Sequence, residues 1–208
     1  GLPKKNITVV YSGINGSHRK AVRIPKKLAS PTILYLGRIK KYKRVDLLVS
    51  LFGEIVRKIP KSRLIVAGWG TEASHLTDII MKSPLRKKIS LVGPVSDKEK
   101  KKLLSQSWVF VNPSIGEGWS IAVIEANLHG TPAVSFNVPG LAESIQQGKT
   151  GLLAKNADDL VTKICSILTD KILRERLSSN ASQWAHEFSW DRSAKESLRV
   201  LEKTRKKN

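Results

Sequence analysis

A chain of 208 residues, 40% of them hydrophobic, can bury a core without disulfides, and its single cysteine, Cys165, excludes a disulfide framework and a thiolate zinc cluster. We expect that lone thiol to be buried and structural. No apolar run approaches the roughly 18 residues that a membrane span needs, and the N-terminal GLPKKNITVVYSG lacks the apolar core of a signal peptide, so we expect a cytoplasmic protein. The 37 Lys and Arg against 17 Asp and Glu give a net charge of +20, which attracts the phosphates of a nucleotide, a nucleic acid or an anionic lipid without choosing among them.

The first 30 residues differ from the rest of the chain. NITVVYSGIN (6–15) could form one strand and a turn, but the following GSHRKAVRIPKKLAS has little periodicity and many charges. We therefore interpret residues 1–30 as a linker, or as the remnant of a junction with something upstream.

From Pro31 onward, short β-branched runs alternate with longer stretches of helical period, which is typical of a parallel sheet with crossover helices. Pro60 ends the first amphipathic helix, and Ser96 and Ser189 are predicted N-caps. The fold class is therefore α/β: a Rossmann-like parallel sheet of about six strands with helices on both faces. Strands are predicted at 32–37, 63–68, 89–93, 108–112, 132–136 and 151–154, and further helices at 72–82, 97–106, 120–129, 157–169, 171–187 and 191–205.

Two cations follow the first predicted strand, in GRIKKYKR. Gly37 lets the backbone approach a ligand, and Arg38 and Lys43 suit a diphosphate, Arg as a bidentate fork and Lys as a point charge. Ligands of an open parallel sheet bind outside the carboxyl ends of its strands, so the position is favourable. A chain with 37 basic residues also places two in one loop by chance, and these residues alone leave both interpretations open.

The segment GWGTEA, after the second strand, matches the dinucleotide pattern Gly-x-Gly-x-x-Ala. That pattern belongs at the first strand-to-helix turn, followed by a strand that closes with an acidic residue, whereas ISLVG closes with Gly93. We therefore interpret Gly68 and Gly70 as a tight turn near a ligand.

The segment NPSIGEGWSIAVIEA combines a turn-rich loop with the start of a helix. The first amides of a helix have no internal partner, so Gly118, Trp119 and Ser120 offer an anion site. Glu117 precedes this helix, and Glu125 is its only acid. A carboxylate in such an apolar helix needs donors, and two sources stay open: ligand hydroxyls at the sheet edge, such as a ribose diol, or a Lys or Arg from a neighbouring helix.

Other catalytic arrangements are missing from the sequence. The four histidines, His18, His75, His129 and His186, are scattered, no Gly-x-Ser-x-Gly elbow occurs, and no phosphate loop ends in Gly-Lys-Ser/Thr. A serine hydrolase, a zinc enzyme and a Walker-type ATPase are disfavoured.

Together GRIKKYK, SLVGPVSDKE, VNPSIGEGWSIAVIEANLHGTPAVS and GKTGLL resemble the C-terminal, nucleotide-sugar-binding half of the group 1 retaining glycosyltransferases, which have the two-domain GT-B architecture. The resemblance covers about residues 32–200, and its signature is Glu117, seven residues, then Glu125. It implies that residues 31–208, including the C-terminal helix, are one half of a GT-B fold that binds a UDP- or GDP-sugar.

The resemblance also implies roles for individual residues. Arg38 and Lys43 would bind the donor diphosphate, Glu117 the donor sugar and Glu125 the ribose, while the amides from Gly118 through Ile121 add phosphate contacts. Arg38, Lys43 and Glu117 are the predicted catalytic residues. No metal or other cofactor is expected, because cations and a helix N-terminus stabilise the departing diphosphate.

Two departures from the family pattern stand out. Arg44 occupies the position after the lysine where the family commonly has Gly. The N-terminal acceptor domain is not in these residues, so we expect this half to transfer sugar to its glycan or lipid-linked acceptor only with a partner chain or the full enzyme supplying that domain. The last helix, which in the family crosses back to the acceptor domain, would then leave Trp190, Leu198 and Leu201 partly exposed.

The charge of +20 supports two other interpretations. A nucleic-acid binder without catalysis would show affinity that falls steeply with salt, although aromatic stacking platforms for single strands are not evident. Basic patches could also hold the protein peripherally at an anionic membrane, which is compatible with the glycosyltransferase interpretation.

Overall fold

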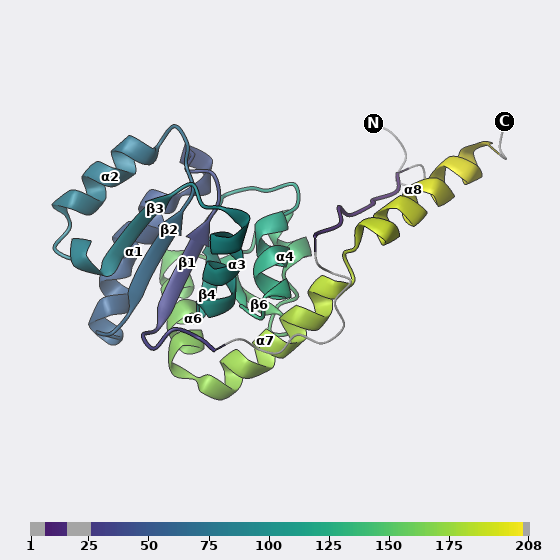
Figure 1. Ribbon diagram of the computed structural model, residues 1–208. Coiled ribbons are helices and arrows are strands. Elements are labelled where there is room, and N and C mark those ends of the chain that lie inside the picture. Colours follow the sequence, from purple (N-terminus) through teal and green to yellow (C-terminus); the bar gives the residue numbers. More distant parts are fainter. Residues whose placement is uncertain (1–6, 16–25, 206–208) are drawn as a thin grey trace.

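The computed structural model describes residues 7–15 and 26–205, and the other residues expected to form the linker, 1–6 and 16–25, lie outside this range. The fold is the predicted α/β sandwich, with one parallel sheet of six strands in the order β3-β2-β1-β4-β5-β6 (Figure 1). The strands are β1 (Thr32–Leu36), β2 (Arg63–Ala67), β3 (Ile89–Gly93), β4 (Val109–Asn112), β5 (Ala133–Phe136) and β6 (Gly151–Ala154). The helices are α1 (Val45–Lys58), α2 (Ala73–Lys82), α3 (Asp97–Gln106), α4 (Ile121–Leu128), α5 (Leu141–Ser144), α6 (Ala157–Thr169), α7 (Lys171–His186) and α8 (Trp190–Arg205), with 3-10 turns η2 (Lys41–Lys43) and η3 (Arg86–Lys88).

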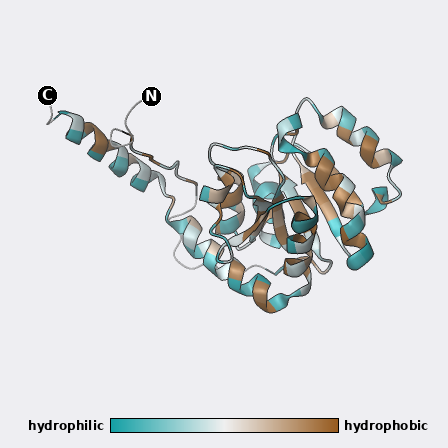
Figure 2. Ribbon diagram, turned by 180° about the vertical axis from the view of Figure 1, so that it is seen from behind, coloured by the Kyte–Doolittle hydropathy of each residue, from teal (hydrophilic) through white to brown (hydrophobic). Residues whose placement is uncertain are grey.

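The central strands are apolar on both faces because helices cover both sides of the sheet. On one side, Ile33 and Tyr35 of β1 share a core with α1 and α6; on the other, Leu34 packs with residues of α3, α4 and α5. Figure 2 shows the hydrophobic strands enclosed between amphipathic helices. Continuous apolar strands are what a parallel sheet with two covered faces requires.

The predicted helix boundaries agree with the observed ones to within about two residues. Helix α1 ends before Pro60, and α3 begins with a complete capping box in which Ser96 and Glu99 satisfy each other's backbone N–H groups. The Ser189 hydroxyl accepts from the N–H of Arg192 at the start of α8. The elements η2, η3 and α5 were not predicted, because a single turn is too short to show a hydrophobic period.

The connectivity creates one topological switch point. From β1 the chain moves outward through β2 to β3, and it then returns to β4, on the other side of β1, before continuing to β5 and β6. The loops that leave the carboxyl ends of β1 and β4 therefore diverge in opposite directions. Such a divergence opens a crevice where open α/β sheets bind their ligands.

Residues 7–15 do not form the strand that the sequence 6–15 could have formed. They run as an extended segment beside the start of α8, with Ile14 N–H donating to the Phe188 carbonyl (2.9 Å) and the Ser193 hydroxyl donating to the Tyr11 carbonyl (2.6 Å) (Figure 1). Both edges of the sheet lie elsewhere, so this segment has no strand to pair with. It is held instead by an aromatic cluster in which Tyr11 and Trp119 ring centroids lie 4.4 Å apart.

Helix α8 extends away from the body of the domain (Figures 1 and 2), and none of its residues is buried. The expected partial exposure of its apolar side chains is confirmed: Trp190 is 53%, Leu198 56% and Leu201 66% exposed. Among the helices of the described ranges, none is both long and apolar enough to cross a bilayer.

The expectation of a buried thiol is only partly correct. Cys165 lies on α6 and is half-buried, packed against the core rather than inside it. Partial burial raises the pKa of the Cys165 thiol.

Candidate functional site

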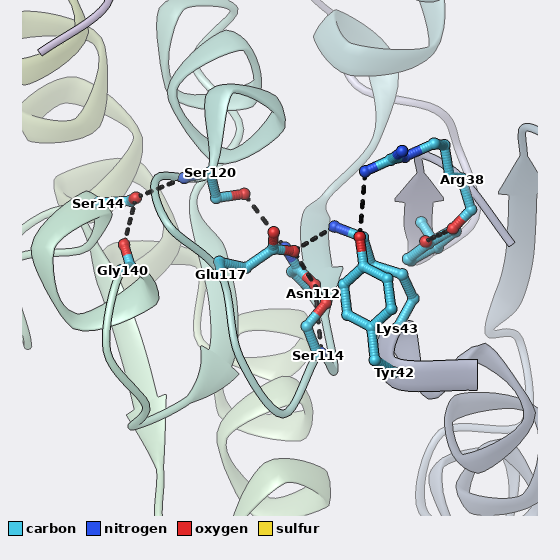
Figure 3. Close-up of polar contacts among 10 residues, drawn as sticks. Arg38, Tyr42, Lys43, Asn112, Ser114, Glu117, Ser120, Gly140 and Ser144 are labelled. Carbon is cyan, nitrogen blue, oxygen red and sulfur yellow. Dashed lines mark hydrogen bonds and ion pairs between the residues drawn. The ribbon is translucent and has the colours of Figure 1, made fainter. Parts of the chain in front are cut away.

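The site lies at the switch point, where the loop after β1 faces the loop after β4. An ion pair spans this gap, with the Lys43 ammonium from η2 contacting Oε1 of Glu117 (Figure 3). The N–H of Ile115 also donates to the Tyr42 carbonyl (3.1 Å), which joins the two loops through their backbones. The structure therefore brings two of the predicted catalytic residues, 74 positions apart in sequence, into direct contact.

The loop after β1 is fixed by the loop after β2. Gly37 N–H donates to the Ala67 carbonyl (3.0 Å) and Ile39 N–H to the Trp69 carbonyl (2.7 Å). A Cβ on Gly68 would lie 1.8 Å from the Gly37 carbonyl oxygen, and one on Gly70 would lie 2.1 Å from that of Ile39. These glycines therefore allow close loop packing, which explains the Gly-x-Gly spacing without a bound dinucleotide.

Tyrosines hold Arg38 in place. The buried Tyr35 hydroxyl donates to the Arg38 carbonyl (2.6 Å). Nη2 of Arg38 donates to the Tyr42 hydroxyl (3.1 Å) (Figure 3). Burial, followed by the nearby Glu117, raises the pKa of Tyr35, so its hydroxyl stays a donor at neutral pH. The Lys43 ammonium lies 5.1 Å from the Tyr42 ring centroid, close enough for a cation–π contact. Tyr42 thus contacts both predicted diphosphate ligands.

Glu117 is held by three donors at one oxygen. Besides Lys43, its Oε1 accepts from the Ser114 hydroxyl (2.9 Å) and from Nδ2 of Asn112 (3.2 Å). The Lys43 and Glu117 side chains are only 13% and 11% exposed, and an ion pair so far from water requires such additional hydrogen bonds. Oδ1 of Asn112 accepts from the Ser114 backbone N–H (3.2 Å) and lies 2.6 Å from the Ser114 hydroxyl, whose single proton is shared between Asn112 and Glu117.

Sequence reasoning did not single out Asn112 and Ser114. Both belong to the quoted segment VNPSIGEGWS, and a polar residue that ends an apolar strand was the available signal. Asn112 is the last residue of β4 and only 4% exposed, so its amide needs partners within the protein. Its side chain links the strand end to Glu117 and, through a 3.1 Å bond, to the Ser120 hydroxyl.

The start of α4 offers fewer free amides than we predicted. The N–H of Ser120 donates to the Ser144 hydroxyl (3.1 Å), which donates in turn to the Gly140 carbonyl (2.7 Å) (Figure 3). Within the described ranges, the N–H groups of Gly118, Trp119 and Ile121 have no acceptor. Three of the four predicted amides are thus available to an anion, with the helix dipole behind them.

The remaining part of this loop is anchored on both sides. The Trp119 ring turns away from the site into the aromatic cluster with Tyr11 and Phe188. Gly140, at φ +77°, packs so closely that a Cβ there would lie 1.9 Å from the Glu117 carbonyl oxygen. The backbone of Glu117 is therefore positioned by the loop that follows β5 as well as by β4.

Glu125 is neither fully buried nor without a partner. Its side chain is 25% exposed, and its Oε1 accepts from the Lys100 ammonium of α3 at 2.8 Å. Of the two sources of donors that the sequence left open, the cation of a neighbouring helix is the one present in the structure. No hydrogen bond to Oε2 is found in the described part of the chain, so that oxygen remains an acceptor for a ligand.

Arg44, where the family pattern has glycine, is the only described residue other than glycine with positive φ (φ 52°, ψ 38°). It joins η2 directly to α1, so the chain must turn sharply between Lys43 and Val45. The left-handed conformation is costly for a residue with a Cβ, which explains the preference for glycine at this position.

In residues 7–15 and 26–205, no three His, Cys, Asp or Glu side chains gather as a metal site. His75 lies in α2, His129 follows α4 and His186 ends α7, whereas His18 lies outside the described residues.

Comparison with known proteins decides the family. The family model described as group 1 glycosyl transferases matches residues 17–184. The chain belongs to this family. Its sheet and covering helices correspond to one half of a GT-B glycosyltransferase, as the motifs predicted.

Individual relatives support the assignment. The chain is 29% identical over 212 residues to an uncharacterised glycosyltransferase of Methanocaldococcus jannaschii, covering 95% of this chain and 54% of that protein. It is 28% identical over 187 residues to a glycogen synthase of Mycobacterium tuberculosis, covering 88% and 45% respectively. The pneumococcal O-GlcNAc transferase GtfA, solved with UDP and GlcNAc, matches with a TM-score of 0.74 and 26% identity over 85% of this chain and 36% of that one. The chain thus spans about half the length of these curated relatives.

Proposed function

We propose that this domain binds a nucleotide-diphosphate sugar at the switch point, and that the full enzyme transfers the sugar to its acceptor with retention of configuration. One observation carries the proposal: Arg38, Lys43, Glu117 and the free amides at the start of α4 converge between the carboxyl ends of β1 and β4. Two cations beside a helix N-terminus suit a diphosphate, and a carboxylate beside them suits sugar hydroxyls.

The ion pair suggests how binding would proceed. A diphosphate that approaches Lys43 competes with Glu117 for the ammonium, and Glu117 keeps Asn112 and Ser114 as donors when Lys43 turns to the phosphate. One oxygen of Glu117 would then accept hydroxyls of the donor sugar. Arg38 and Lys43 would stabilise the negative charge that develops on the leaving diphosphate, so that no metal is required.

UDP is the first nucleotide to test, because the related GtfA was solved with UDP and GlcNAc. GDP-sugars remain the second choice. The acceptor, a glycan or a lipid-linked sugar, would be bound by an N-terminal domain, either in the same protein or in a separate chain. Acceptor transfer therefore needs that domain, whereas donor binding does not.

The proposal is tested by calorimetry of the domain with UDP, GDP, ADP and their sugars. We expect one base to bind measurably, and Arg38→Ala to weaken it by about tenfold or more, since hydrogen bonds to charged groups contribute about 1.5–3 kcal/mol. Lys41→Ala is the matched control, because Lys41 is an exposed cation in the same loop. Absence of binding by every nucleotide, or equal losses in both variants, would overturn the proposal.

The same protein preparation tests the rival function. A nucleic-acid binder would hold a mixed-sequence oligonucleotide with an affinity that falls steeply between about 50 and 200 mM salt, and Arg38→Ala would weaken it no more than Lys41→Ala. Binding of anionic vesicles that leaves nucleotide affinity unchanged would instead indicate peripheral membrane attachment in addition to donor binding.

A further inference from the structure

We infer that Lys100 positions Glu125, holding one carboxylate oxygen so that the other faces the ribose hydroxyls of the bound nucleotide. The inference rests on the proposed function, and it assigns the preference for a ribonucleotide to a pair of residues rather than to Glu125 alone. In this inference Lys100 acts through Glu125, so it is a positioning residue.

The fold directs Lys100 toward α4. Leu104, one helical turn later on the same face of α3, is fully buried in the core that α3 and α4 share with the sheet. The capping box at Ser96 fixes the first turn of α3, and Lys100 N–H closes that turn on the Ser96 carbonyl (2.8 Å). The capping box before Lys100 and the buried Leu104 after it therefore fix the backbone at Lys100, in the helix that follows β3.

Lys100 differs from the other lysines of its helix. Lys98, Lys101 and Lys102 are exposed, and no ion pair involves them in the described ranges. The Lys100 side chain is only 26% exposed, and its ammonium contacts Oε1 of Glu125 at 2.8 Å and Oδ1 of Asp97 at 3.4 Å. These two carboxylates outweigh the effect of burial and raise the pKa of Lys100, so the ammonium stays charged.

The ion pair between Lys100 and Glu125 reduces the negative charge at this edge of the sheet. An isolated carboxylate near the nucleotide would repel the incoming diphosphate, and the Lys100 ammonium, 2.8 Å from Oε1, offsets the charge of Glu125. The lysine also restricts the Glu125 rotamer and leaves Oε2 unoccupied. A carboxylate oxygen fixed in this way accepts a hydrogen bond from a ribose hydroxyl, but a deoxyribose position has no hydroxyl to donate one.

The experiment compares UDP with 2′-deoxy-UDP and 3′-deoxy-UDP by calorimetry. The wild type should prefer UDP to at least one deoxy analogue by about tenfold, as expected for a hydrogen bond to a charged group. Lys100→Ala should reduce this ratio to about threefold or less and should also weaken the binding of UDP, because Glu125 loses its fixed orientation and its counter-charge. Lys100→Arg should restore most of the ratio, since it retains a cation of similar reach.

Two controls separate positioning from charge or stability. Lys101→Ala removes the same charge from the neighbouring, exposed position and should leave both affinities within about twofold. The double variant Lys100→Ala/Glu125→Gln should bind UDP only slightly more weakly than Glu125→Gln alone, because both substitutions remove the same interaction.

The outcomes distinguish this inference from the proposed function. If the wild type binds UDP and Lys100→Ala keeps the full preference, or if Lys101→Ala has the same effect as Lys100→Ala, the assignment of Lys100 is wrong and donor binding stands. If the wild type binds neither UDP nor GDP nor ADP, the proposed function fails, and this inference fails with it.

Discussion

Replacing Arg44 by glycine should stabilise the domain. Arg44 is held at φ 52° and ψ 38° between η2 and α1, a conformation that costs a residue with a Cβ about 1–2 kcal/mol. Glycine adopts it freely but is more flexible in the unfolded chain, which costs about 0.5–1 kcal/mol. The midpoints of these two ranges differ by about 0.75 kcal/mol, which is the expected gain in the free energy of unfolding.

Thermal unfolding is a sufficient assay for a change of this size. For domains of about 150–250 residues, 1 kcal/mol corresponds to about 2–4 °C in the unfolding midpoint, so Arg44→Gly should raise it by about 1–4 °C. Lys40→Gly is the matched control: Lys40 is a cation of the same loop with φ −129° and ψ 155°, where glycine brings only its entropic cost. The control should lower the midpoint by about 1–4 °C.

The opposite signs of the two substitutions are the critical result. A fall in the midpoint of Arg44→Gly as large as that of Lys40→Gly would show that the left-handed conformation of Arg44 is not a source of strain. Backbone strain would then not explain the family's glycine at this position.

Three further predictions concern packing and protonation. Gly68→Ala should destabilise the domain by more than Gly148→Ala, as measured by urea unfolding, and should also abolish UDP binding, as measured by calorimetry. Both glycines have positive φ, but only at Gly68 would a Cβ strike the Gly37 carbonyl. Lys27 is half-buried and donates to the Ser105 and Gly130 carbonyls and to Thr131, and desolvation, with Arg174 nearby, lowers its pKa from 10.5 to about 7. The unfolded chain therefore binds more protons between about pH 7 and 10, so urea unfolding should show the wild type gaining stability over Lys27→Met as pH rises through this window. Cys165, whose thiol pKa is raised by burial, should react with a disulfide reagent at pH 7.5 more slowly in the native protein than in urea, and equal rates would contradict its packing against the hydrophobic core.

Much of the fold was predictable because its signals are local. Apolar runs of four or five residues, separated by helical periods and ended by Gly, Asn or Pro, gave all six strands and the longer helices. The site could be placed at the carboxyl edge for the same reason, since Arg38 and Lys43 follow one predicted strand and Glu117 another. The strand that 6–15 could have formed is absent because this segment lies beside the start of α8 and pairs with neither edge strand, β3 or β6, and no local pattern reveals that placement.

The sequence by itself determined the residue types at the site and the strands that carry them. Only the tertiary structure decided which charges meet: Lys43 with Glu117, and Lys100 rather than a more distant cation with Glu125. It also showed that Gly68 and Gly70 serve the contact between two loops. Periodicity is a property of neighbouring residues, whereas the partner of a charged group depends on the paths of separate loops and helices through space, and a chain with 37 cations offers too many candidates for sequence alone to choose.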